Sequence, residues 1–319
     1  MPLIALPPII GHRCARAFAP ENTLAGLTRA AALRDAWIND APLHDAAANQ
    51  DAFRTQWVEV DVRLTADGVP VLLHDATLER TTNGYGAIAE MTWARACRLD
   101  AGRYFGAAFA DEPVPSLGAF LRAAIGHGIG VNLELKATAE EATALAAAAL
   151  EVAQALWQPA AAGAGTPPPL ISSFSSAALE VSARLAPDWP RGLLLDELRP
   201  GWLTEARRVG AAAIIVNHQA LTADDVVTEL GADDRLVLAY TVNDPARALC
   251  LRHWGVAAVI TDRPDTEMAM AMAAKIRLAG KNFLYGSMVT SCGGRGHNEQ
   301  HEATGAALSV AGSMIGRVP

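Results

Sequence analysis

The sequence predicts an α/β protein folded as a (β/α)8 TIM barrel with a small insertion after the second strand region. Its 319 residues, of which 51% are hydrophobic, are enough to bury one large core or two ordinary ones. Short apolar runs rich in β-branched residues alternate with longer segments rich in alanine and leucine up to about residue 278. Eight such units in about 270 residues match the usual size of this barrel, whose ligand sites lie at the C-terminal ends of the strands.

Each predicted strand is an apolar run with polar residues at or near its end, and a helical segment follows it. In chain order the strands are PPIIGHR, WVEVDVRLT, GVNLELK, PLISSF, GLLLDEL, AAIIVNHQ, LVLAYTVN and VAAVITDRP. The alanine-rich stretch 139–162 is predicted to be a helix, which GAGTPPP interrupts before the next strand.

Three segments depart from the alternation. Residues 39–56 lengthen the connection between the first helix and the second strand, and we expect a surface excursion with a short helix there. Residues 75–115, after VPVLLHD, form the predicted insertion, which is long enough to cover the site as a lid. The barrel domain is therefore predicted to span 1–278, and 279–319, which have no persistent period, form a C-terminal tail of unknown role.

Charge and composition exclude several classes of partner. A formal net charge of −8 and a sequence pI near 5.5 argue against general affinity for nucleic acid or anionic membranes. The apolar N-terminus lacks the features of a signal peptide, and no apolar stretch approaches the roughly 20 residues that span a membrane. The four scattered cysteines form no CxxC pair, so we expect no zinc site and a cytoplasmic location.

Acidic residues occupy strand positions that should face the barrel interior. In WVEVDVR, the period of two puts the three valines on one face and Glu59, Asp61 and Arg63 on the other. In GVNLELK, the same alternation groups Glu134 with Lys136. Three carboxylates would repel one another without a cation, and oxygen ligands favour one divalent ion, Mg²⁺ or Ca²⁺ with Mn²⁺ as a further candidate. The alternative is that the acids pair with the two basic residues in the packed barrel.

Two histidines follow apolar runs at predicted strand ends, His12 and His74. A single histidine in this position is more often a structural residue, but two beside a carboxylate cluster can act as general acid and general base near neutral pH. Three carboxylates and one divalent ion leave a net negative charge, so an anionic substrate needs further positive charge. Arg13 and Lys136 supply it, and this favours phosphoester chemistry.

Together these residues resemble the glycerophosphodiester phosphodiesterase family. The resemblance covers roughly residues 8–270, and the combination of its motifs is more specific than any one of them. In order they are HR with PENT (12–23), EVDVRLTADGVPVLLHDATLERTTNG (59–84), LDAG with a later F (99–105), VPSLGAFL (114–121), LELK (133–136), SSF (172–174), YTVN (240–243) and TDRPD (261–265).

The resemblance implies a TIM barrel that hydrolyses glycerophosphodiesters to glycerol 3-phosphate and an alcohol with a divalent cation. It implies that the metal ligands are Glu59, Asp61 and Glu134 and that the acid–base pair is His12 and His74. It also implies that Arg13 and Lys136 contact the phosphate. The aromatic residues Phe174 and Tyr240 would line the glycerol or alcohol side of the pocket. For the two aromatic residues, ordinary barrel packing is the alternative.

Within the motifs, Cys14 stands where the family usually has glycine, so a turn there must accommodate a Cβ atom. We expect Asn22 to cap the following helix and Glu21 to orient Arg13 or a histidine. Two other functions remain open: a phospholipase D-like phosphodiesterase acting on intact lipids, and a catalytically silent barrel that binds phosphodiesters. The expected partner is a small-molecule substrate, and a homodimer is compatible with the sequence.

Overall fold

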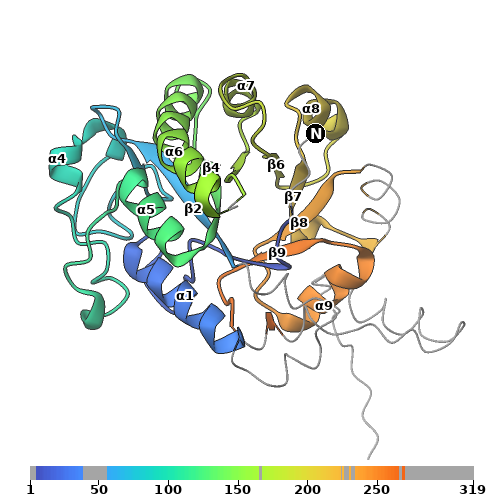
Figure 1. Ribbon diagram of the computed structural model, residues 1–319, viewed down its shortest axis with the longest axis horizontal. Coiled ribbons are helices and arrows are strands. Elements are labelled where there is room, and N and C mark those ends of the chain that lie inside the picture. The colour runs from blue at the N-terminus through green and yellow to red at the C-terminus, as the bar shows by residue number, and fades with distance from the viewer. Residues whose placement is uncertain are drawn as a thin grey trace, which may run out of the picture. The chain divides into compact units, whose positions relative to one another are not determined.

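Eight parallel strands close into a barrel in the computed structural model (Figure 1), which describes residues 5–38, 56–164, 167–223, 225, 230, 234–265 and 268–269. The barrel strands are β1 (Ile9–Gly11), β2 (Trp57–Leu64), β4 (Gly130–Leu135), β5 (Leu170–Ser173), β6 (Arg191–Leu195), β7 (Ala213–Asn217), β8 (Leu236–Tyr240) and β9 (Ala258–Thr261). β1 pairs in parallel with both β2 and β9, which closes the ring. Seven of the eight lie within strands predicted from the sequence, and β6 begins one residue before its predicted strand, at Arg191.

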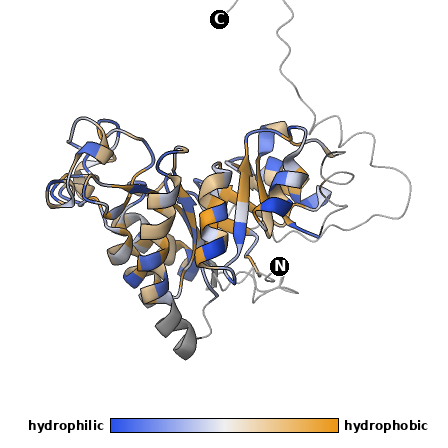
Figure 2. Ribbon diagram, turned by 90° about the horizontal axis from the view of Figure 1, so that it is seen from above, coloured by the Kyte–Doolittle hydropathy of each residue, from blue (hydrophilic) through white to orange (hydrophobic). Residues whose placement is uncertain are grey.

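The helices lie outside the strands, as Figure 1 shows. They are α1 (Leu24–Ile38), α5 (Leu117–His127), α6 (Ala142–Ala164), α7 (Ser176–Leu185), α8 (Trp202–Arg208) and α9 (Pro245–Trp254). In Figure 2 the helices carry both hydrophobic and hydrophilic residues. In α5 the buried residues Leu117, Phe120, Leu121 and Ala124 have the spacing of one helical face.

A ninth strand, β3 (Pro70–Leu72), pairs antiparallel with the end of β2 and lies outside the ring. It ends just before the predicted insertion at 75–115. That segment contains η1 (Ile88–Glu90), α4 (Trp93–Ala96) and η2 (Ala107–Phe109). It also has a small hydrophobic cluster of its own, around Leu78 and Val114. Its action as a lid stays a prediction.

The predicted alternation along β2 and β4 is confirmed. Val58, Val60 and Val62 belong to the core between the strands and the helices. Trp57 belongs to a second cluster, formed only by strand residues and their neighbours, which fills the barrel interior. Trp57 fits there because its register partner on β4 is Gly130, where a Cβ atom would lie 2.3 Å from the indole. Because side chains alternate, Glu59 and Asp61 face the same interior, toward the C-terminal end.

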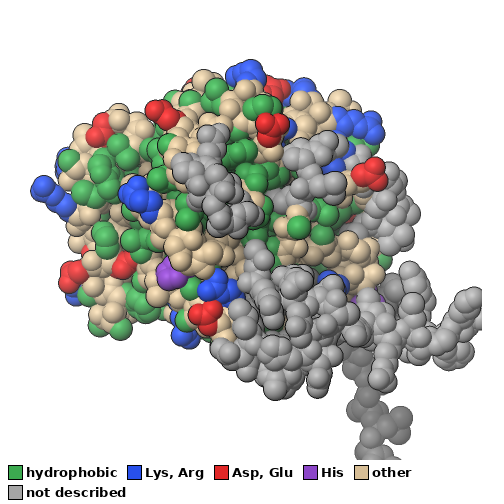
Figure 3. Space-filling model, in the orientation of Figure 1, with side chains coloured by type: hydrophobic (Ala, Val, Ile, Leu, Met, Phe, Trp, Pro, Cys, Tyr) green, Lys and Arg blue, Asp and Glu red, His purple; other side chains and the backbone are tan. Residues whose placement is uncertain are grey.

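Some predictions fall outside the described residues: the excursion at 39–56, apart from Gln56, and the tail at 279–319. In the part of the chain that the structure describes, no helix is long and apolar enough to cross a membrane. On the face drawn in Figure 3, basic and acidic side chains are interspersed. The cytoplasmic location and the homodimer stay predictions.

Candidate active site

The C-terminal ends of β1, β2 and β4 bring the predicted acids and bases together. Each of Glu59, Asp61 and Glu134 is buried and offers one carboxylate oxygen, and these oxygens lie within 4.8 Å of one another. Asp61 and Glu134 are register partners on the adjacent strands β2 and β4, which is why two acids far apart in sequence meet.

The carboxylates in this cluster repel one another, and this shifts their pKa values. Burial, followed by the charges of Asp61 and Glu134, raises the pKa of Glu59 well above its usual range. Burial and the charge of Asp61 likewise raise the pKa of Glu134. Burial would also raise the pKa of Asp61, but the charges of Lys136 and Arg13, with other contacts, outweigh it and lower that pKa. The raised pKa values of Glu59 and Glu134 show that nearby cations only partly compensate the negative charge of the cluster.

Two cations from the chain neutralise part of that charge. The Lys136 ammonium lies 2.5 Å from Glu134 Oε1 and 3.2 Å from Asp61 Oδ1. The Arg13 guanidinium contacts Glu21 Oε1 at 2.8 Å and Asp61 Oδ2 at 3.3 Å. The alternative of ion pairing is thus realised for Lys136. Arg13 is only 7% exposed, so it is less available to a phosphate than the sequence suggested.

His12 extends from β1 toward the cluster. Its Nδ1 lies 2.6 Å from Asp262 Oδ1, just after β9, and its Nε2 lies 3.9 Å from Glu59 Oε2. Burial would raise the pKa of Asp262, but the hydrogen bond and charge of His12 lower it, so the carboxylate is ionised and only accepts. Nδ1 therefore carries a proton, and Nε2 is the ring nitrogen that faces Glu59.

His74, after β3, has a similar arrangement. Its Nδ1 lies 2.6 Å from Asp75 Oδ1, and Arg80 donates to both oxygens of that carboxylate at 2.5 and 3.1 Å. The hydrogen bond from Arg80, more than any other contact, holds the pKa of Asp75 far below its usual value. Burial lowers the pKa of His74. Near pH 7 the neutral imidazole predominates, with Nδ1–H donating to Asp75.

The loop after β1 adopts an unusual backbone. Arg13, Cys14 and Asn22 have φ angles of 47°, 77° and 57°, in the left-handed region that favours glycine. This conformation explains why glycine suits the position of Cys14. Here the Cys14 side chain is fully buried, and burial, then the charges of Glu59 and Asp61, raises the pKa of its thiol well above the usual range. Such a thiol is inert, so Cys14 has no reactive role here.

The prediction that Asn22 caps the helix is wrong. Asn22 donates from Nδ2 to Asp61 Oδ2 at 2.8 Å and accepts at Oδ1 from the Asp61 amide at 3.1 Å. The cap is Thr23, whose hydroxyl accepts from the Gly26 amide at 3.0 Å. The left-handed backbone turns the Asn22 amide away from the helix and toward β2, which local sequence cannot indicate.

Replacing Asn22 with alanine is expected to lower the free energy of unfolding by roughly 3 kcal/mol, because a buried carboxylate loses a donor and alanine strains a left-handed position. Urea denaturation measures it. Asn22→Gly separates the two causes, since glycine adopts this φ without strain and should recover part of the loss. An alanine variant within about 0.5 kcal/mol of the wild type would contradict the assigned contacts.

Glu21 joins this loop to the insertion. Its carboxylate contacts Arg13 at 2.8 Å, Arg16 at 3.0 Å and Arg80 at 2.8 Å, and its amide donates to the Tyr104 hydroxyl. Burial would raise the pKa of Glu21, but hydrogen bonds from Arg80 and Arg13 lower it. The expectation that Glu21 orients Arg13 is confirmed by this contact.

Sequence reasoning missed Asp75, Asp262 and Arg80. All three stand inside motifs that carried the resemblance, in LLHD, TDRPD and LERTTNG. An acid directly after a strand-end histidine, and an acid directly after the last strand, were signals that could have found the first two.

The two predicted aromatic residues meet at the ends of β5 and β8. Phe174 and Tyr240 pack edge to face, with ring centroids 6.0 Å apart, and Lys136 Nζ lies 5.9 Å from the Phe174 centroid. Phe174 is 41% exposed, which ordinary barrel packing does not explain. The Tyr240 hydroxyl donates to Asp196 Oδ1 at 2.8 Å.

The chain is similar to several known proteins. The model of the "Glycerophosphoryl diester phosphodiesterase family" matches residues 46–266, which include β2 to β9 and begin after His12 and Arg13. The Bacillus subtilis protein YhdW is 30% identical over 263 residues, which are 81% of this chain and 95% of that protein. A second B. subtilis relative, named glycerophosphodiester phosphodiesterase, is 26% identical over 270 residues, 80% of this chain and 83% of its own length.

A solved structure is similar as well. The phosphodiesterase of Oleispira antarctica, in complex with the product sn-glycerol-3-phosphate, has a TM-score of 0.72 and 31% sequence identity. The match covers 84% of this chain and 98% of that one.

Proposed function

The chain belongs to the glycerophosphoryl diester phosphodiesterase family, and from this premise we propose that it hydrolyses glycerophosphodiesters to glycerol 3-phosphate and an alcohol by acid–base catalysis at His12 and His74. One observation carries the proposal: two imidazoles, each held by a carboxylate at Nδ1, at the strand ends that carry a buried cluster of three carboxylates. The relative in complex with sn-glycerol-3-phosphate supports the choice of product.

One histidine removes the proton from the attacking hydroxyl, which belongs either to water or to the glycerol 2-position, and the other protonates the leaving alcohol. If the glycerol hydroxyl attacks, a cyclic phosphate forms and is then hydrolysed, with the histidines exchanging roles. Burial lowers the pKa of His74, so its ring is neutral near pH 7 and able to accept a proton. Asp75 and Asp262 hold the two rings in the tautomer whose Nε2 can accept that proton.

The acid cluster fits one divalent cation. Its donors are carboxylate oxygens only, which favours Mg²⁺ or Ca²⁺, with Mn²⁺ as a further candidate. Glu59 Oε1 is buried and accepts no hydrogen bond from the described residues. Such an orphaned oxygen is costly unless a cation satisfies it. When bound to Glu59, Asp61 and Glu134, the ion would polarise a phosphoryl oxygen and lower the pKa of the attacking hydroxyl.

Lys136 is the main phosphate contact in this proposal, because it is more exposed than Arg13 and lies between the acid cluster and the aromatic pair. Arg13, whose Nη1 and Nε contact Glu21 and Asp61, contributes positive charge to the phosphate site from a more buried position. Phe174 and Tyr240 form an apolar wall for the glycerol or alcohol side of the substrate.

The test is release of choline and glycerol 3-phosphate from glycerophosphocholine, first with EDTA and then with Mg²⁺, Ca²⁺ or Mn²⁺ restored. We expect no release with EDTA and recovery with at least one of the ions. No release with any ion, also on glycerophosphoethanolamine, would favour the silent binding barrel. Faster turnover of detergent-dispersed intact lipid would favour a phospholipase D-like enzyme.

A further inference from the structure

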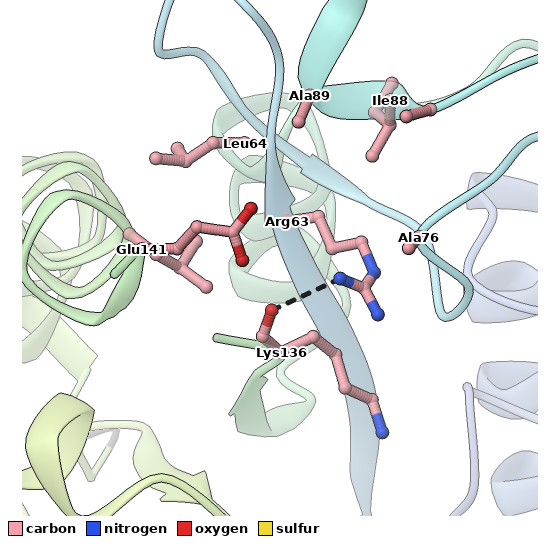
Figure 4. Close-up of a pocket in the computed structure, with 9 residues that line it drawn as sticks. Arg63, Leu64, Ala76, Ile88, Ala89, Lys136 and Glu141 are labelled. Atoms are coloured by element: carbon pink, nitrogen blue, oxygen red, sulfur yellow. Dashed lines mark hydrogen bonds between the residues drawn. The ribbon is translucent and has the colours of Figure 1, made fainter. Parts of the chain in front are cut away.

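Arg63 is the next inward-facing residue of β2 after Asp61, at the point where β2 leaves the ring to pair with β3. Its Nε donates to the backbone carbonyl of His74 at 2.9 Å, and its Nη1 donates to the backbone carbonyl of Lys136 at 3.3 Å. Figure 4 shows the guanidinium beside the Lys136 carbonyl. One planar side chain thus bridges two segments that β3 and β4 bring to the site separately.

No carboxylate of the described residues lies within ion-pair distance of Arg63, although the charges of Asp61, Glu141 and Asp75 all act on it. Burial outweighs these charges and lowers its pKa, but an arginine remains charged. The sequence offered an ion pair with an acid as an alternative for Arg63. The guanidinium is held instead by its hydrogen bonds to two backbone carbonyls.

We propose that Arg63 is a positioning residue that fixes the backbones of His74 and Lys136 relative to each other. The inference rests on the proposed function, in which His74 transfers a proton and Lys136 contacts the phosphate. Because the two carbonyls belong to those residues themselves, a shift of either backbone moves the side chain that does the chemistry. The task needs a planar fork, since a lysine ammonium donates from a single point on a flexible stem.

A cavity adjoins the guanidinium and makes the proposal testable. It has a volume of about 160 Å³, and Figure 4 shows it between β2, the insertion and the start of α6. Small and apolar side chains form most of its wall, among them Ala76, Ala89 and Leu145. In an Arg63→Ala variant this cavity would open onto the two carbonyls, with room for a free guanidinium ion.

The experiment measures kcat and KM for glycerophosphocholine in the wild type, Arg63→Ala and Arg63→Lys, with and without guanidinium well below unfolding concentrations. We expect Arg63→Ala to lower kcat by about 10–100-fold, the usual cost of losing a group that orients a reacting one. Added guanidinium should restore much of that loss. Arg63→Lys should keep the fold and remain slow, and it decides the matter if the alanine variant does not fold.

Arg191 provides the matched control. It too is a buried arginine whose guanidinium donates to backbone carbonyls, those of Val209 and Trp189, but it lies at the start of β6, at the other end of the barrel. Arg191→Lys should lower the melting temperature without changing kcat, and guanidinium should not affect its rate.

The outcomes separate this inference from the proposed function. No turnover by the wild type would reject the function itself. With an active wild type, a kcat of either folded Arg63 variant within about threefold of wild type would overturn the positioning role. So would a loss of kcat in Arg63→Ala that accompanies a lower melting temperature and does not respond to guanidinium.

Discussion

Alanine at His12 or at His74 is expected to lower kcat by at least about 100-fold, because each imidazole transfers a proton in our proposed mechanism. Both rings are held at Nδ1 by a carboxylate 2.6 Å away, so each variant removes a positioned proton carrier. The measurement is the rate of glycerol 3-phosphate release from glycerophosphocholine at saturating substrate and cation. KM should change less than kcat, because neither ring is the main phosphate contact.

His127 is the control for this prediction, because its side chain is exposed at the end of α5 and contacts no part of the site. His127→Ala should turn over as fast as the wild type. Asp75→Asn and Asp262→Asn test orientation separately, since each removes the ionised partner while leaving the histidine. Near-normal turnover by either histidine variant would reject the acid–base assignment.

Removal of the divalent cation should abolish turnover, and replacing Asp61 with asparagine should greatly weaken its binding. The negative charge of Asp61 helps to raise the pKa values of both Glu59 and Glu134, so Asp61 interacts with both of the other proposed ligands. A cation that binds the folded chain stabilises it by about 2.7 kcal/mol when present at 100 times its dissociation constant. The wild type should therefore melt at a higher temperature with Mg²⁺, Ca²⁺ or Mn²⁺ than with EDTA, and Asp61→Asn should not.

Calorimetric titration of the EDTA-treated protein gives the same comparison without any measurement of activity. Glu151→Gln is a suitable control, because this exposed acid of α6 lies outside the cluster and should leave both the melting shift and the dissociation constant unchanged. If the wild type binds none of the three ions, or Asp61→Asn binds them equally well, the acid cluster is not the metal site.

The barrel and most of its site could be predicted because they follow from local patterns. Period-two alternation in WVEVDVR sends every second side chain inward, so Glu59 and Asp61 had to share a face with Trp57. A histidine directly after an apolar run, as at His12, marks the C-terminal end of a strand, where barrel enzymes place their chemistry. Neither conclusion needs knowledge of a contact between distant residues.

The contacts that hold the site could not be predicted in this way. Asn22 looked like a helix cap because its position before α1 suggests one, yet a left-handed backbone directs its amide to Asp61 on a neighbouring strand. Arg63 looked like an ion-pair partner for the acids on its own face, but β2 leaves the barrel there and the guanidinium meets carbonyls instead.

The sequence by itself therefore determined the fold class, the strands and the placing of Glu59, Asp61, Glu134, His12 and His74 on inward faces or at strand ends, because these depend on periodicity and on chain neighbours. Only the tertiary structure decided which partner each of them has. Asp262 reaches His12 because β1 and β9 are neighbours in a closed ring, and Arg80 joins Asp75 to Glu21 because the insertion folds back on the loop after β1. Such partnerships depend on ring closure and loop conformation, which join residues up to 250 positions apart in the chain.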